Sequence, residues 1–171
     1  MISNRSNGAA APQRWLCAAL MTVLLGTACT PTEPNELDEL GTVDMTIQGE
    51  TFKLWIADSA SETARGLMFV TADQMKPLSN GTERGMIFVF DSDRQLSFWM
   101  RNTIIPLDIA YVNSDGRVVN TYTMAPLDDD LGKYPSEEAA RYAIEVNAGV
   151  WSRIGLQKGD NLDIPQSLLN P

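Results

Sequence analysis

Alternating apolar and polar residues run through much of the chain from residue 42 onward. Val43, Met45 and Ile47 alternate with polar residues, and the alternation returns over residues 52–56 after a Gly-containing turn. Because successive side chains of a strand point to opposite faces of a sheet, this pattern predicts a β-hairpin with one buried face.

Further strands are predicted from apolar runs and from the turn residues between them. Residues 85–90 form a continuous apolar run, typical of a strand buried on both faces. A turn at residues 91–93 would pair this strand with residues 96–100 in a second hairpin. The remaining predicted strands are residues 107–112, 118–124, 142–146 and 161–164, and the Asp-Gly pair at 115–116 favours a hairpin between the first two.

Helices are predicted to be few and short. Ser59 and Glu62 have the Ser-x-x-Glu spacing of a capping box, which predicts a helix that follows Ser59. One helical turn is predicted at residues 136–140, and a short amphipathic helix at residues 150–154. The fold class is therefore α+β, mostly β. We expect a single domain over residues 42–171, with a small, strongly curved sheet or partly closed barrel of about seven short strands.

The N-terminal segment has a different pattern. Arg5 and Arg14 precede an uncharged apolar run over residues 15–28, as in a secretory signal. Small residues lead directly into Cys29, which resembles a bacterial lipoprotein signal in which the cysteine is lipidated. An ordinary cleaved signal is the alternative. We predict a signal peptide over residues 1–28 and a flexible acidic tether over residues 29–41.

These predictions locate the mature protein in the cell envelope. A lipid anchor alone would hold it to the membrane, facing the periplasm, because each buried acyl CH₂ contributes roughly 0.8 kcal/mol. The residue after Cys29 is Thr30 and not an aspartate, as in lipoproteins that are sorted to the outer membrane. The net charge is −9, and loss of Arg5 and Arg14 with the signal leaves −11. This acidity argues against a nucleic-acid partner, and the sequence identifies no protein partner.

The missing residue types narrow the possible chemistry. The chain has no histidine, and its two cysteines are Cys17 in the predicted signal and Cys29 at the predicted anchor. A catalytic Ser-His-Asp triad, cysteine catalysis and an imidazole metal site are therefore excluded. We expect no metal and no cofactor.

Residues 98–108 bring an indole, a guanidinium, an amide and a carboxylate close together between two predicted strands. In the strand near residue 145, Glu145 and Asn147 share one face, while the apolar Ile144 and Val146 share the other. The candidate ligand-binding residues are Arg65, Trp99, Arg101, Asn102, Asp108, Glu145 and Asn147. Aromatic faces beside convergent polar groups are common in small-molecule and sugar sites.

Several motifs occur in a family-specific order. They are Arg65 to Phe69, Gly85 to Phe90, Phe98 to Thr103, Ile105 to Asp108, Tyr134 to Ser136 and Glu145 to Gly149. Together they resemble the successive motifs of the bacterial and archaeal domain of unknown function family 192. The resemblance implies a compact β-rich domain, often exported, with no established activity.

Three functions are compatible with these residues. The first is non-catalytic binding of a small polar ligand or envelope component such as a glycan, with Trp99 or Trp151 as an apolar wall. The second is a structural or protein-interaction module, in which Arg101, Asp108 and Glu145 form an ion-pair network that fixes loops to the sheet. The third is a glycosidase-like enzyme that uses Asp108 and Glu145 as its two carboxylates.

Overall fold

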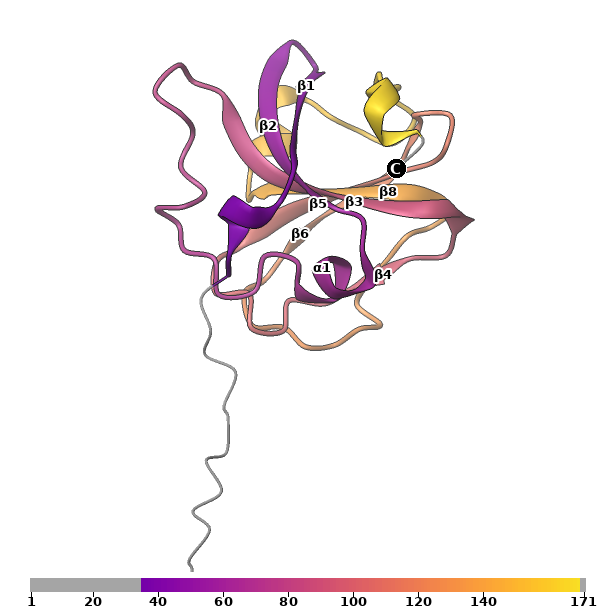
Figure 1. Cartoon of the computed structure of the whole chain (residues 1–171). Coiled ribbons are helices and arrows are strands. Elements are labelled where there is room, and N and C mark those ends of the chain that lie inside the picture. Colours follow the sequence, from indigo (N-terminus) through magenta and orange to yellow (C-terminus); the bar gives the residue numbers. More distant parts are fainter. Residues whose placement is uncertain (1–34, 170–171) are drawn as a thin grey trace, which may run out of the picture. The chain divides into compact units, whose positions relative to one another are not determined.

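Figure 1 shows the computed structural model of the chain, which describes residues 35–169. These residues lie in one unit that spans Thr32–Pro171. The strands are β1 (Thr42–Ile47), β2 (Glu50–Ala57), β3 (Glu83–Arg94), β4 (Ser97–Phe98), β5 (Leu107–Val112), β6 (Val118–Met124), β7 (Tyr134–Pro135) and β8 (Ala140–Asn147). The α-helices are α1 (Ala60–Arg65) and α2 (Val150–Ile154), and the 3₁₀-helices are η1 (Leu37–Glu39) and η2 (Gln166–Leu168).

Six strands form one mixed sheet in the order β1-β2-β3-β8-β5-β6, and β4 pairs with β7 in a separate two-stranded sheet. The β2–β3 pair is parallel, because α1 and the loop after it return the chain to the N-terminal end of β2 before β3 begins. The other pairs are antiparallel. β8 lies between β3 and β5, so a residue of β8 has strand neighbours on both sides.

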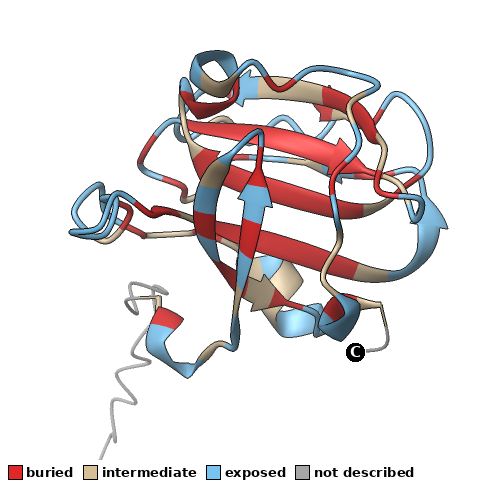
Figure 2. Ribbon diagram, turned by 90° about the horizontal axis from the view of Figure 1, so that it is seen from above, coloured by how far each residue is buried: buried red, intermediate tan, exposed pale blue. Residues whose placement is uncertain are grey.

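The sheet separates two apolar cores. One face, here called the cavity face, presents Met86, Phe88, Ile109 and Tyr111, which pack against the segments after α1 and around β4 and β7. The other face, here called the α2 face, packs against α2 and the C-terminal segment and presents the strand residues Ile87, Val89, Ile144 and Val146. Figure 1 shows α1 and β4 on one side of the central strands and the C-terminal segment, in yellow, on the other. The central strands are buried along most of their length (Figure 2).

The predicted fold class is confirmed. The sheet is curved, does not close into a barrel and includes two of the three predicted hairpins, β1–β2 and β5–β6. The capping box is also present, since Ser59 Oγ accepts from Glu62 N while the Glu62 carboxylate accepts from Ser59 N. The helix predicted at residues 150–154 is α2.

The predicted hairpin between residues 85–90 and 96–100 is wrong. Residues 91–93 continue β3 in extended conformation, and the antiparallel neighbour of β3 is β8. Only Ser97 and Phe98 form a strand, and they pair with β7. The apolar residues Leu96 and Met100 are buried because they pack into the segments that cover the cavity face, not because they join the sheet.

Two further local predictions are wrong. Residues 136–140 form no helical turn, because Ser136 is held at β4: its N–H donates to Leu96 O and its Oγ accepts from Leu96 N. Residues 161–164 form no strand beyond a single bridge between Asn161 and Arg117. The Leu162 N–H donates to Gly116 O at 2.8 Å, so this segment closes the edge of β6 with isolated hydrogen bonds.

The predicted signal peptide over residues 1–28 and its Cys29 lie outside the described residues. Within the segment predicted as a tether, residues 35–40 contact the domain. Leu37 in η1 is 4% exposed and packs into the core of the cavity face. Asn35 Nδ2 donates to Gly66 O at 2.7 Å and to Met68 O at 2.9 Å. The folded domain therefore includes the C-terminal part of that segment.

Candidate functional site

Glu145 is a buried carboxyl group at the middle of the sheet. On β8 it lies between Met86 of β3 and Ile109 of β5, and it is 3% exposed. Within residues 35–169 its side chain has no hydrogen bond and no ion pair. Burial without a compensating partner raises the pKa of Glu145 to about 8. At neutral pH the group is therefore a protonated carboxylic acid, with one O–H donor and a free acceptor oxygen.

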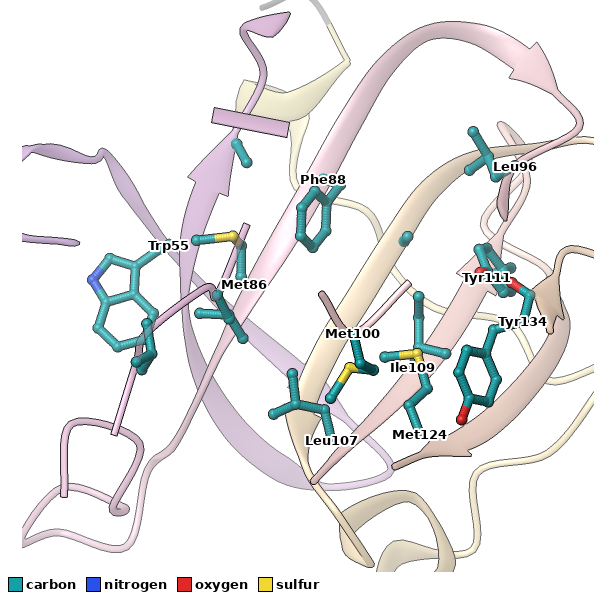
Figure 3. Close-up of a cluster of buried hydrophobic side chains, with 14 of the residues drawn as sticks. Trp55, Met86, Phe88, Leu96, Met100, Leu107, Ile109, Tyr111, Met124 and Tyr134 are labelled. Carbon is teal, nitrogen blue, oxygen red and sulfur yellow. Dashed lines mark hydrogen bonds between the residues drawn. The ribbon is translucent and has the colours of Figure 1, made fainter. Parts of the chain in front are cut away.

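A cavity of about 530 Å³ lies above Glu145, which forms part of its lining. Its inner walls are apolar and include Leu67, Phe88 and Phe98. The Phe88 and Phe98 rings meet edge to face with their centroids 4.8 Å apart, and Phe98 meets Tyr111 in the same way at 5.9 Å. Figure 3 shows Phe88 and Tyr111 in the apolar cluster of this face. This volume lies in the range of natural small-molecule sites.

The rim of the cavity is basic. Arg65, Arg94 and Arg101 belong to its lining. Arg101 Cζ lies 5.4 Å from the centroid of the Trp99 ring, and Arg94 Cζ lies 4.4 Å from that of Phe90. These are cation–π distances. The cavity therefore combines a basic rim, aromatic walls and a neutral acid group within its lining.

Backbone hydrogen bonds hold the rim segment in place. Asn102 has a left-handed backbone (φ 57°), and its carbonyl accepts from the N–H of Phe69, which is also left-handed (φ 61°). The Met100 N–H donates to Asp128 O at 2.6 Å. Such conformations cost free energy in residues with a Cβ and persist only where surrounding contacts fix them. The turn that presents Trp99 and Arg101 is thus fixed on two sides.

Of the residues predicted from sequence, the structure brings Arg65, Trp99, Arg101 and Glu145 together around the cavity. Asn102 is not in its lining. Asn102 instead holds the neighbouring segment through its carbonyl, which accepts from the Phe69 N–H. Its Nδ2 lies 3.9 Å from the sulfur of Met68.

Asp108 is buried on the α2 face, away from the cavity. Its Oδ1 accepts from Thr123 Oγ1 at 2.6 Å, and its Oδ2 accepts from Trp151 N at 3.0 Å. Trp151 lies in the first turn of α2, where the N-cap residue Gly149 has no side chain to accept a backbone N–H. Asp108 therefore caps α2 from a neighbouring strand.

Asn147 and Trp151 are also absent from the cavity lining. Asn147 Nδ2 donates to Met75 O at 2.8 Å and so fixes the loop that follows α1. Trp151 is 3% exposed on the α2 face, with its ring centroid 5.6 Å from that of Phe52. Trp99, not Trp151, is the tryptophan at the cavity.

The predicted network of Arg101, Asp108 and Glu145 does not form. None of the three makes an ion pair within the described part of the chain. Asp108 is paired with Val146 and Glu145 with Ile109, so the two carboxyl groups point to opposite faces of the sheet. They cannot flank one glycosidic bond, and this overturns the glycosidase-like alternative.

Sequence reasoning missed Arg94 and the phenylalanines of the cavity. Phe88 and Phe90 alternate in β3, so their period-2 spacing could have placed them on one face with Met86. Arg94 followed a predicted turn that does not exist, and no signal in the sequence placed it near Arg101. Among the described residues, no group of three acidic side chains is arranged to hold a metal ion. No described helix is long and apolar enough to cross a bilayer.

Comparisons with known proteins agree with this architecture. The family DUF192, described as Uncharacterized ACR, matches residues 43–164. A protein of unknown function from Novosphingobium aromaticivorans DSM 12444 has a similar crystal structure, with a TM-score of 0.63 and 32% identity over 77% of this chain and 91% of that one. A putative transcription regulator from Sinorhizobium meliloti 1021 matches with a TM-score of 0.59 and 31% identity, over 71% of this chain and 90% of the other. No curated protein shows significant similarity.

Proposed function

This chain belongs to the uncharacterised DUF192 family, and we propose that it binds a small polar ligand, without catalysis, in the cavity above Glu145. The observation that supports this most strongly is the unpartnered Glu145 carboxyl. Buried polar groups in proteins are nearly always hydrogen-bonded, and an unsatisfied one costs roughly 1 to 3 kcal/mol. A ligand that accepts from or donates to Glu145 would satisfy it.

The surroundings of Glu145 also support binding. Aromatic walls beside a few polar groups are the usual anatomy of a small-molecule site. The cavity volume suits one metabolite or one to two sugar units rather than a folded partner. The second carboxylate that an acid–base pair would need, Asp108, is hydrogen-bonded on the other face of the sheet, which is why we propose binding rather than catalysis.

Titration of the purified chain against envelope sugars and muropeptides tests this proposal. A bound ligand should change the emission of Trp99 at the rim and raise the melting temperature. Trp99→Phe should abolish the emission change and keep the thermal shift, whereas the control Trp55→Phe should keep both. Glu145→Leu, which removes the carboxyl group from the cavity lining, should fold and weaken binding at least tenfold.

A second candidate function is protein interaction, favoured by exposed apolar side chains on the segments around the cavity. Trp99, Ile104, Leu127 and Leu131 are 36%, 46%, 63% and 51% exposed. Exposed apolar groups that gather in one region mark interaction surfaces more often than isolated ones do. Unchanged emission and melting temperature across the whole ligand panel would favour this second function over ligand binding.

We also propose that the domain is attached to the periplasmic face of the envelope through lipidated Cys29. The support is in the sequence alone: the uncharged run over residues 15–28 and the small residues before the cysteine. In the native host, the full chain should appear in the membrane fraction and carry an acyl mass on Cys29. Cys29→Ser should move it to the soluble fraction, and an unchanged distribution would contradict the anchor.

A further inference from the structure

The charges around the cavity are unlike those of the rest of the chain. The chain contains 22 acidic residues against 13 basic ones. Among the residues that line the cavity, three are arginines (Arg65, Arg94 and Arg101) and the acidic one is Glu145, which is neutral at pH 7. The cavity is therefore a positively charged site on a negatively charged protein.

Two of these arginines have no carboxylate partner within residues 35–169. Arg117 pairs with Glu138 at 2.6 Å, and Arg153 pairs with Glu83 at 2.7 Å. Arg94 and Arg101 make no ion pair and no hydrogen bond there, and each instead lies over an aromatic ring. Their N–H donors are thus available, although the chain has many acids that could have paired with them.

Aromatic contacts also help to position these guanidinium groups. A ring under the guanidinium restricts its movement while leaving the N–H groups free to bind an oxyanion in a fork geometry. Arginine binds carboxylate and phosphate oxygens with two parallel hydrogen bonds, which are among the strongest that proteins form. Arg94 and Arg101 come from opposite ends of the segment that contains β4, so an anion between them would contact both ends.

We propose that the ligand is a small cyclic oxyanion, a carboxylate or phosphate of metabolite size. Its charged group contacts Arg94 and Arg101 at the rim, its ring lies against Trp99 and Phe98, and a hydroxyl or carbonyl on the ring contacts Glu145. This inference rests on the proposed function and names the ligand class of the same cavity.

The neutral state of Glu145 fits this ligand class. A carboxylate within the same cavity would repel an anion, whereas a protonated acid offers an O–H donor without charge. An anionic membrane surface could also attract the arginines. It is disfavoured, because a flat array of headgroups could not contact Glu145, which is 3% exposed.

The test compares ligands that share a ring and differ in charge: glucose, glucuronate and glucose 6-phosphate, together with benzyl alcohol and benzoate. Isothermal titration calorimetry of the full chain with Cys29→Ser should show at least tenfold tighter binding of the charged member within each series. The double variant Arg94→Ala/Arg101→Ala should lose that preference. Arg84→Ala is a matched control, because Arg84 also lies over a ring, Trp55, at 4.5 Å, but does not line this cavity.

Each outcome supports or overturns the inference. Glu145-dependent binding of glucose and glucuronate with equal affinity would overturn the anion preference and leave the proposed function standing. No heat with any member of either series, and none with the wider sugar panel, would overturn both. Binding of phosphatidylglycerol vesicles that depends on Arg94 and Arg101, without competition from glucuronate or benzoate, would overturn the inference in favour of a membrane surface.

Discussion

Two buried carboxyl groups of the sheet, Asp108 and Glu145, lie on opposite faces and differ in what surrounds them. On the α2 face, Asp108 accepts a hydrogen bond on each oxygen, from Thr123 and from Trp151 N. On the cavity face, Glu145 has no hydrogen-bond partner in residues 35–169 and borders open space. The two groups are close in the sheet, because Asp108 is paired with Val146, the residue that follows Glu145.

This difference separates the structural role of Asp108 from the ligand-binding role that we propose for Glu145. Burial of a carboxyl group is costly unless hydrogen bonds replace those to water. Asp108 accepts two such hydrogen bonds, from Thr123 and Trp151, and they connect β5 with β6 and α2. Glu145 receives none from residues 35–169 and lines the cavity, which is why we propose that a molecule entering the cavity supplies its hydrogen bond.

The largest expected effect comes from removing the satisfied carboxyl. Asp108→Ala leaves the Trp151 N–H without an acceptor and deletes two hydrogen bonds to a carboxylate. Hydrogen bonds to charged groups contribute about 1.5 to 3 kcal/mol each, so the free energy of unfolding should fall by roughly 3 to 5 kcal/mol. Urea denaturation followed by circular dichroism measures this.

Thr123→Val serves as the partial control for Asp108→Ala. It removes one of the two hydrogen bonds and keeps the cap on α2, so a loss of about 1.5 to 3 kcal/mol is expected. If Asp108→Ala were as stable as the wild type, the assignment of Asp108 as the structural carboxyl would be wrong.

A smaller effect is expected from the pH dependence that Glu145 creates. Its pKa is raised to about 8 in the folded chain and returns to about 4.5 on unfolding. Between these values the folded chain holds a proton that the unfolded chain has released, so this contribution to stability is complete below pH 4.5 and is lost as the pH rises to 8. From pH 5.5 to pH 8 the free energy of unfolding should fall by on the order of 3 kcal/mol.

Glu145→Gln isolates this contribution. The variant has no titrating group at this position, so its stability should change much less over the same pH range. The measurement should stay above pH 5, because Glu62 and Glu138 have lowered pKa values and lose their own contribution in acid. Parallel pH profiles for the wild type and Glu145→Gln would falsify the assignment of Glu145 as the unpartnered acid.

Much of the fold could be predicted from sequence because its signals are local. Alternation identified β1 and β2, and the capping box identified α1 because both of its hydrogen bonds join residues three apart. The prediction failed where a distant segment decides the outcome. Leu96 and Met100 look like strand residues, yet they are buried by packing against residues far along the chain.

The candidate site could be predicted only in part, for a similar reason. Alternation correctly separated Glu145 from Ile144 and Val146, but it could not relate the faces of two strands without their register. Since Asp108 is paired with Val146, it lies on the α2 face, and the predicted cluster divides between the two faces. Arg94 and Arg101 line the same cavity because of the course that residues 95–100 take between them, and no local sequence pattern predicts that course.

The central position of β8 also affects the order in which the site is assembled. Gly85 pairs with Val146, 61 positions later in the chain, whereas both hairpins join neighbouring segments. Hairpins close within microseconds, but pairing across long separations is slow. During synthesis from the N-terminus, the cavity walls from β3 and β4 are made before β8 supplies Glu145. We therefore expect the proposed site to be completed late, when β8 pairs with β3 and β5.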